Sequence, residues 1–250
     1  MKLSGHTVLI TGAGTGMGLE AATQFSRRGN RVIMVARNEE RLRREADQLD
    51  GAVVYACDIA DATQVAGLLA FVEQQHPDLD VVLLNAGVTH TYRLFGDEDS
   101  LAHAEVEMRT NYLSAIRLID ALVPRLARTA DPALIVTTSG VAFAPDITNP
   151  TYSATKAALH SLTQSVRLQL ERDGSNIKVF EFMAPAVDSP FSAAVDSDVK
   201  ITPAAAVAEL FDGLEHDELE LHVGLTKRTF QLLSESSDAA LRAVNTATGG

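Results

Sequence analysis

Short apolar segments alternate with longer amphipathic stretches along the whole chain, and this alternation limits the possible folds more than any other feature. Seven segments rich in Val, Ile and Leu have the length of strands, and most are continuously apolar. Such runs are typical of parallel strands that are covered on both faces. The predicted strands are His6–Thr11, Arg31–Ala36, Ala52–Cys57, Asp80–Asn85, Ala133–Thr138, Ile177–Met183 and Glu218–Val223.

The stretches between these strands have the pattern of helices, and Thr202 followed by Pro203 is typical of a helix start. The repeated strand–helix–strand order predicts an α/β fold. We expect one domain over residues 1–250, a doubly wound parallel sheet of about seven strands with helices on both faces. Ligands of such folds bind outside the carboxyl ends of the strands. The predicted helices are Gly18–Arg28, Glu39–Leu49, Ala62–Gln75, Leu101–Leu126 (one helix or two), Tyr152–Glu171 and Pro203–Glu215.

Composition excludes several classes of function. The 250 residues carry a formal net charge of -12, which repels nucleic acid and anionic membranes. No apolar run has the ~20 residues that a membrane helix needs, so we expect no membrane insertion. Cys57 is the only cysteine, so no internal disulfide can form, and we expect a cytoplasmic protein. The histidines are scattered and the chain has no cysteine cluster, which argues against a metal site. His160 is expected to be a packing or interface residue.

A glycine-rich loop directly follows the first predicted strand and opens a helix. The loop reads Thr11-Gly12-Ala13-Gly14-Thr15-Gly16-Met17-Gly18. Glycines let the backbone approach a pyrophosphate closely, and the helix N-terminus supplies free N–H groups. The alternative is a glycine-rich turn without a ligand. By itself the loop does not separate NAD(P) from other nucleotides.

Two further strand ends carry polar or small residues. Asp58 and Ile59 follow the third strand, where a carboxylate can accept from an adenine amino group. The alternative is that Asp58 or Asp61 caps the next helix. The fourth strand ends in Asn85-Ala86-Gly87, which lets the chain pass close to a ribose or simply forms a turn.

Tyr152 and Lys156 are four residues apart and therefore share one face of a predicted helix. A nearby ammonium favours the phenolate, so we expect the Tyr152 pKa to lie below its ordinary ~10. That would make the phenol a proton donor and acceptor near neutral pH. Ser139 ends the preceding strand, where its hydroxyl can hold a substrate oxygen. The pair alone is also compatible with an accidental exposed Tyr and Lys.

Arg37 follows the second strand, at the position where an NAD-specific site would carry Asp or Glu. A guanidinium can bind two oxygens of a 2′-phosphate. The alternative is a solvated Arg37 at the start of a charged helix, drawn away by Glu39 or Glu40. The sequence therefore predicts NADP(H) in preference to NAD(H).

Together these motifs resemble the short-chain dehydrogenase/reductase family over nearly the whole chain, with TGAGTGMG, NAG, Ser139 and YSATK in family order and spacing. The resemblance implies a Rossmann-type fold. The pattern Pro185-Ala186-Val187-Asp188, with ATKAALHS from Ala154 onward, is similar to the branch of oxidoreductases named for D-alanine esterification of teichoic acids. The family resemblance implies that Tyr152 is the proton donor/acceptor, that Lys156 also binds the nicotinamide ribose and that Ser139 orients the carbonyl. Asn111 matches the family's helix asparagine, which supports a water in the proton relay, although an asparagine here can also cap or kink a helix.

The segment after the sixth strand departs from the family pattern. Its usual Pro-Gly is Pro185-Ala186, and Ser189 is the nearest hydroxyl to the usual Thr. Pro185 and Val187 are expected to contact the carboxamide. The predicted cofactor residues are Gly12, Thr15, Gly16, Met17, Gly18, Arg37, Asp58, Ile59, Asn85, Ala86, Gly87, Tyr152, Lys156, Pro185 and Val187.

The predicted function is hydride transfer between nicotinamide and a small carbonyl or alcohol substrate. The alternative is a nucleotide-binding regulator that keeps the fold without turnover; an epimerase or dehydratase fits less well because only a short segment follows Pro185. The resemblance implies a homodimer or homotetramer built on Leu101–Leu126 and Tyr152–Glu171. We expect the substrate pocket to be walled by Thr89–Phe95, Val141–Pro145 and a lid over 188–202.

Overall fold

A seven-stranded parallel sheet forms the centre of the computed structural model, which describes residues 1–195 and 199–246. The strand order is β3-β2-β1-β4-β5-β6-β7. All seven predicted strands are present, with bounds within three residues of those expected. They are β1 Thr7–Thr11, β2 Arg31–Ala36, β3 Val53–Ala56, β4 Val81–Leu84, β5 Ala133–Ser139, β6 Lys178–Ala184 and β7 Glu220–His222.

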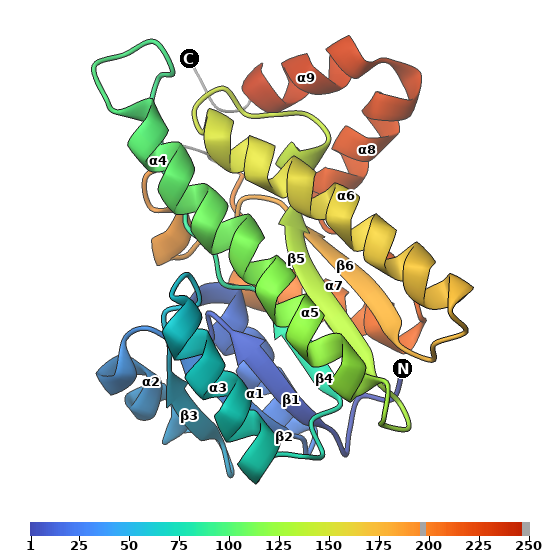
Figure 1. Ribbon diagram of the computed structural model, residues 1–250. Coiled ribbons are helices and arrows are strands. Elements are labelled where there is room, and N and C mark those ends of the chain that lie inside the picture. The colour runs from blue at the N-terminus through green and yellow to red at the C-terminus, as the bar shows by residue number, and fades with distance from the viewer. Residues whose placement is uncertain (196–198, 247–250) are drawn as a thin grey trace.

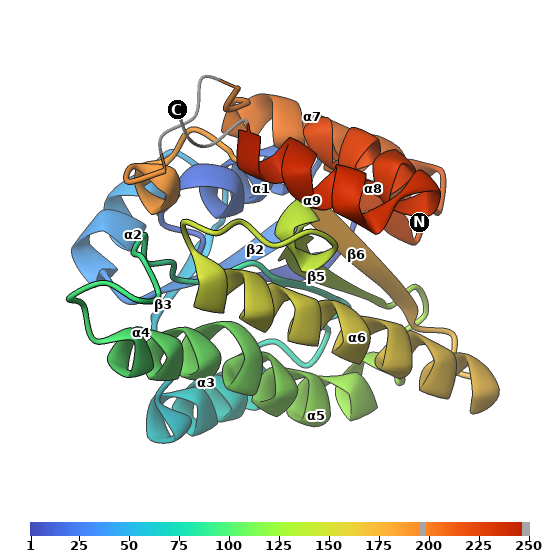
Figure 2. The same cartoon turned by 90° about the horizontal axis from the view of Figure 1, so that it is seen from above.

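Helices cover both faces of the sheet, as the alternating pattern predicted (Figures 1 and 2). Phe25, Leu210 and Phe211 belong to the buried cluster on one face, and Leu68, Leu118 and Leu159 belong to the cluster on the other. Each predicted helix is present, and the observed bounds are α1 Gly16–Arg27, α2 Glu39–Ala46, α3 Ala62–Gln75, α4 Ser100–Glu107, α5 Ser114–Leu126, α6 Pro150–Arg172 and α7 Pro203–Glu215.

The stretch Leu101–Leu126, predicted as one helix or two, forms two α-helices that follow one another without an intervening loop. A π-helical turn over Met108–Leu113 joins α4 to α5, and Asn111 lies within it. Glu107, directly before it, and Asn111 are both almost fully buried.

Two C-terminal helices were not predicted from the sequence. They are α8 Leu225–Glu235 and α9 Ser237–Thr246. Figure 1 shows both lying beyond the end of the sheet toward which the arrow of β5 points. Ser236 supplied a local signal, because its hydroxyl accepts from the backbone N–H of Ala239 at the start of α9.

The sheet order reverses between β1 and β4, and ligands bind doubly wound folds beside such a reversal.

Candidate functional site

The glycine loop joins β1 to α1 at the point where the sheet order reverses. Gly12 adopts φ +69°, a conformation that favours glycine. A Cβ atom at Gly18 would lie 2.3 Å from the Gly12 carbonyl oxygen, so this position needs glycine for close packing. Thr15 stands at the N-cap of α1 and its side chain makes no cap hydrogen bond. The N–H groups of the first turn therefore remain available to an anion.

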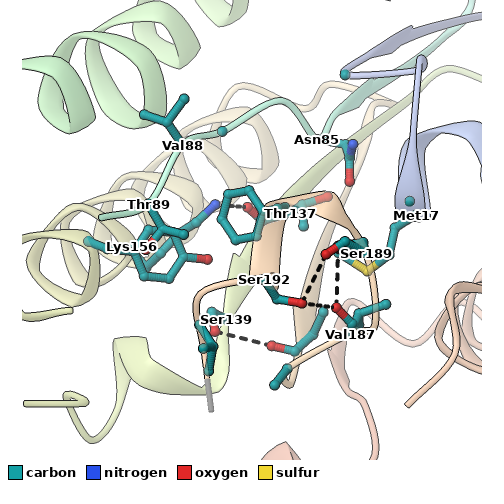
Figure 3. Close-up of a pocket in the computed structure, with 18 of the residues that line it drawn as sticks. Met17, Asn85, Val88, Thr89, Thr137, Ser139, Lys156, Val187, Ser189 and Ser192 are labelled. Carbon is teal, nitrogen blue, oxygen red and sulfur yellow. Dashed lines mark hydrogen bonds between the residues drawn. The ribbon is translucent and has the colours of Figure 1, made fainter. Parts of the chain in front are cut away.

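A cavity of about 930 Å³ runs from this loop along the carboxyl ends of the strands. Figure 3 shows Met17, Asn85 and Ser189 toward one end of the view and Ser139, Lys156 and Thr89 toward the other. Of the predicted catalytic and cofactor residues, only Gly18 and Asn111 do not line it. Of the substrate-pocket walls predicted at Thr89–Phe95 and Val141–Pro145, only Thr89, His90 and Val141 line it. The predicted residues on its wall are Gly12, Thr15, Gly16, Met17, Arg37, Asp58, Ile59, Asn85, Ala86, Gly87, Ser139, Tyr152, Lys156, Pro185 and Val187.

The Asn85-Ala86-Gly87 segment is fastened to the first strand. The Thr11 hydroxyl accepts from the N–H groups of Asn85 and Ala86 at 3.0 and 3.1 Å, and the Asn85 amide donates to the Thr11 carbonyl oxygen at 3.2 Å. These bonds hold the end of β4 against the glycine loop. Asn85 thus has a structural role as well as a place on the cavity wall.

The two aspartates after β3 have different positions. Asp61 caps α3, because its carboxylate accepts from the N–H groups of Thr63 and Gln64. The helix-capping alternative is therefore correct for Asp61. Asp58 accepts from the N–H of Ala60 at 3.0 Å and lines the cavity with Ile59.

Two arginines line the cavity near the end of β2. Arg37 was predicted from its position, whereas Arg41, one turn further on in α2, was not. Asn38 caps α2 by accepting from the N–H of Arg41 at 2.9 Å. Glu39, considered as a competitor for Arg37, forms an ion pair with Arg43 instead.

Three of the predicted catalytic side chains line the cavity and are buried. Tyr152, Lys156 and Ser139 are each less than a tenth exposed. The Lys156 ammonium lies 5.6 Å from the centre of the Tyr152 ring and donates to the Thr137 carbonyl oxygen at 2.8 Å. The Ser139 hydroxyl donates to the Ala184 carbonyl oxygen at 3.1 Å. An accidental exposed pair is thereby excluded, because both side chains are buried at a cavity wall.

The direction of the Tyr152 pKa shift is opposite to the one expected from the sequence. Burial raises the Tyr152 pKa above its ordinary value, because the phenolate loses water. The Ser139 hydroxyl works against this shift, and the Glu107 charge adds to it. Burial also lowers the pKa of Lys156 to about 8, although the Glu181 carboxylate opposes that change. Tyr152 therefore holds its proton at neutral pH.

Asn111 connects three elements from behind the cavity. Its carbonyl oxygen accepts from the Val88 N–H at 2.8 Å, and its amide donates to the Val88 carbonyl oxygen and to the Thr155 hydroxyl at 2.9 and 3.0 Å. The π-helical turn brings it to this position. The structure thus shows a buried asparagine within a π-helical turn that ties the segment after β4 to α6.

The segment after β6 turns back on itself beside the glycine loop. Val187 pairs with Ile201 in a short parallel bridge. Asp217 is the only residue other than glycine with positive φ in the described chain, so Ala186 has a backbone conformation that alanine adopts freely. Phe191 places its ring 5.7 Å from that of Tyr152. The predicted lid over 188–202 includes 196–198, which lie outside the described residues.

Residues from α8 and α9 also line the cavity, and sequence reasoning missed them. Thr226 packs against Gly140, where a Cβ atom would meet its hydroxyl at 2.8 Å. Asn245 fastens α9 to the segment after β5, since its amide donates to the Pro145 carbonyl oxygen and its own oxygen accepts from the Ile147 N–H. The wall residues from these helices are Leu225, Thr226, Arg228, Thr229, Leu232, Ala243, Val244 and Thr246.

Across residues 1–195 and 199–246, no group of acidic, histidine or cysteine side chains is arranged to hold a metal ion. His160 contacts the buried Glu181 carboxylate at 2.9 Å and packs against Phe143, which agrees with a packing role. In the same part of the chain, no helix is both long and apolar enough to cross a bilayer.

The sequence comparisons agree with this geometry. Residues 6–200 match the family model described as short chain dehydrogenase. The chain belongs to the short-chain dehydrogenase family. A relative from Bacillus subtilis, the uncharacterised oxidoreductase DltE, is 37% identical over 196 residues, which cover 76% of this chain and 74% of the relative. An uncharacterised oxidoreductase of Staphylococcus aureus is 28% identical over 210 residues, 83% of this chain and 89% of the relative. The predicted likeness to this branch of the family is confirmed.

Solved structures of the family have the same fold over almost the whole chain. A short-chain dehydrogenase from Burkholderia cenocepacia in complex with NADP has a TM-score of 0.86 at 25% identity, covering 98% of this chain and 99% of its own. One from Sphingobium yanoikuyae in complex with NADPH has a TM-score of 0.79 at 25% identity, covering 98% of each chain. A relative from Burkholderia phymatum in complex with NAD reaches 0.86 at 16% identity over 100% of this chain and 99% of its own, and supports the fold alone.

Proposed function

We propose that this chain is an NADP(H)-dependent oxidoreductase that moves a hydride between nicotinamide and a carbonyl or alcohol substrate. The observation that carries the proposal is that Tyr152, Lys156 and Ser139 lie on the wall of the same cavity as the glycine loop. A nucleotide-binding regulator would not need a buried tyrosine, lysine and serine at the far end of its nucleotide site.

The cavity has features that fit a dinucleotide. The uncapped start of α1 offers N–H groups to a pyrophosphate, and Asp58 offers a carboxylate to an adenine amino group. Arg37 and Arg41 line the same end and suit a 2′-phosphate. The Thr137 hydroxyl is buried without a hydrogen-bond partner among the described residues, as expected where a polar group binds beside it. The nicotinamide ring, when bound, supplies or accepts the hydride.

The residues around Tyr152 control the proton. In carbonyl reduction, the Tyr152 hydroxyl donates its proton to the oxygen that gains negative charge, and the Ser139 hydroxyl donates a hydrogen bond to the same oxygen. The buried Lys156 ammonium stabilises the phenolate that remains. Asn111 positions the Val88 backbone and α6, and in this proposal supports the water of the proton relay.

Replacement of Tyr152 by Phe tests the proposal, because it removes the transferable proton and keeps the ring. We expect kcat to fall about 10²–10⁴-fold, the usual contribution of general acid catalysis. NADPH affinity should stay close to that of the wild type. Turnover of a carbonyl panel and NADPH binding are measured side by side. Near-wild-type turnover by Tyr152→Phe contradicts the role of Tyr152, and binding without turnover by the wild type favours the regulator.

A further inference from the structure

Glu107 is fully buried at the junction of α4 and the π-helical turn, close to the catalytic residues. One carboxylate oxygen accepts from the backbone N–H of His90 at 2.7 Å and contacts the His90 ring nitrogen Nδ1 at 3.0 Å. The other accepts from the Thr151 hydroxyl at 2.5 Å. A buried carboxylate needs such donors to remain ionised. Glu107 is therefore a fixed negative charge with all its bonds directed at His90 and the start of α6.

This arrangement fixes the imidazole of His90. An ionised carboxylate only accepts hydrogen bonds, so Nδ1 carries the hydrogen that it donates to Glu107, and in the neutral form of this tautomer Nε2 carries the lone pair. The His90 ring also stacks on His103, with 4.4 Å between the ring centres. His90 lines the cavity, and Nε2 has no hydrogen bond to any residue within the described parts of the chain. A positioned acceptor thus stands at the wall of the site.

Thr89 adds a donor next to this acceptor. Its hydroxyl is buried and makes no hydrogen bond to the residues that the structure describes, although buried hydroxyls are normally paired. Thr89 lines the same cavity, and Figure 3 shows it on the side of Lys156. The two neighbouring side chains therefore offer one acceptor and one donor that the protein itself does not use.

We infer that His90 and Thr89 bind a hydroxyl group of the substrate, which donates to Nε2 of His90 and accepts from the Thr89 hydroxyl. This inference rests on the proposed oxidoreductase function and names its substrate class: carbonyl compounds with a second, hydroxyl oxygen, and the corresponding diols. A hydroxyl suits the site better than a carboxylate, because the Glu107 charge behind the ring repels a second anion. Glu107 acts as a positioning residue.

Three probes that share one propanoyl end test the inference: 1-hydroxy-2-butanone, 3-pentanone and 2-oxobutanoate. They carry a hydroxymethyl, an ethyl and a carboxylate group beside the reacting carbonyl. We expect wild-type kcat/KM with NADPH to be about tenfold higher for the hydroxyketone than for 3-pentanone, as one or two hydrogen bonds would give. The decisive quantity is how the ratio of kcat/KM for the hydroxyketone to that for 3-pentanone changes between wild type and variant. The difference in intrinsic reactivity of the two ketones is the same in both proteins and therefore cancels.

His90→Phe and Thr89→Val keep the shape of the wall and should each lower the ratio several-fold. Glu107→Leu should also lower it, because a side chain without an acceptor no longer fixes the His90 ring. His103→Phe is the matched control: it keeps the stacked ring, does not line the cavity and should leave the ratio unchanged. An unchanged ratio in both His90→Phe and Thr89→Val overturns the inference, as does a wild-type preference for 2-oxobutanoate. NADPH affinity and melting temperature verify that each variant is folded.

A second measurement is independent of turnover. In protein labelled with ¹³C-histidine and loaded with NADP⁺, the ring Cε1–H resonance of His90, assigned with His90→Phe, is followed during titration. A saturable shift with 1-hydroxy-2-butanone and none with 3-pentanone supports the inference even where no turnover is seen. Equal responses to both probes overturn it. Absence of any Tyr152-dependent NADPH oxidation contradicts only the proposed function.

Discussion

Arg37 should determine the choice between NADPH and NADH, and Arg37→Ala tests this most directly. Arg37 lines the cavity beside the end of β2, and Asn38 fixes the chain there by capping α2. Glu39 pairs with Arg43, so it does not neutralise Arg37. The side chain is left to interact with a 2′-phosphate.

The magnitude follows from the exposure of this site. A hydrogen bond to a charged group is worth roughly 1.5–3 kcal/mol. Arg37 is exposed, and solvent screening weakens exposed ion pairs, so the lower end applies. Since each 1.4 kcal/mol is about a factor of ten, Arg37→Ala should reduce kcat/KM for NADPH about tenfold. The value for NADH should change little.

The assay compares kcat/KM for NADPH and NADH in wild type, Arg37→Ala, Arg41→Ala and the double variant. Arg41 lines the same end of the cavity and should contribute a similar factor, with less than additive loss if both bind one phosphate oxygen. Arg44→Ala is the control, because Arg44 pairs with Glu45 and does not line the cavity. A wild-type preference for NADH, or an unchanged ratio in Arg37→Ala, refutes the reasoning.

Three further predictions follow from the same structure. Burial lowers the Lys156 pKa to about 8, so kcat/KM for carbonyl reduction should fall as the pH rises through about 8 and the ammonium loses its proton. A pH–rate profile in which kcat/KM stays level to about pH 9.5 would contradict this prediction. Gly18→Ala should lower the free energy of unfolding by about 1–3 kcal/mol, measured by urea denaturation, because its Cβ meets the Gly12 carbonyl oxygen; Gly14→Ala, with ordinary contacts, should change it much less. We expect a homodimer or homotetramer, because apolar side chains are exposed along the helices predicted to form the interface: Leu101, Val106, Leu113, Ile116 and Leu168. Light scattering should give a mass that is a multiple of 26.7 kDa, and the double variant Leu113→Glu/Ile116→Glu should reduce that mass. A wild-type monomer at micromolar concentration would exclude this interface.

The sequence by itself determined the sheet and was sufficient to predict the main candidate site residues. Continuous apolar runs predict buried parallel strands, because a strand that helices cover on both faces carries apolar side chains on both of them. The glycine loop, Asn85-Ala86-Gly87 and Ser139 were found because parallel strands place their carboxyl ends at one edge. Helical spacing puts Tyr152 and Lys156 on one face, and the resemblance to the family gave the pair its expected role. These signals are local, so one chain suffices to detect them.

Tertiary structure decided the features that depend on contacts between distant residues. Burial of Tyr152 among Ser139, Phe191 and Glu107 reverses the expected direction of its pKa shift. The π-helical turn, which no local residue pattern announces, buries Glu107 and Asn111. Gly18 is required by a backbone contact with Gly12, and Arg41 and α8 reach the cavity only through the folded chain. In each case the physical cause is the loss of water around a side chain or a close approach between two segments. These effects arise only in the folded chain, so the periodicity and spacing of residues cannot predict them.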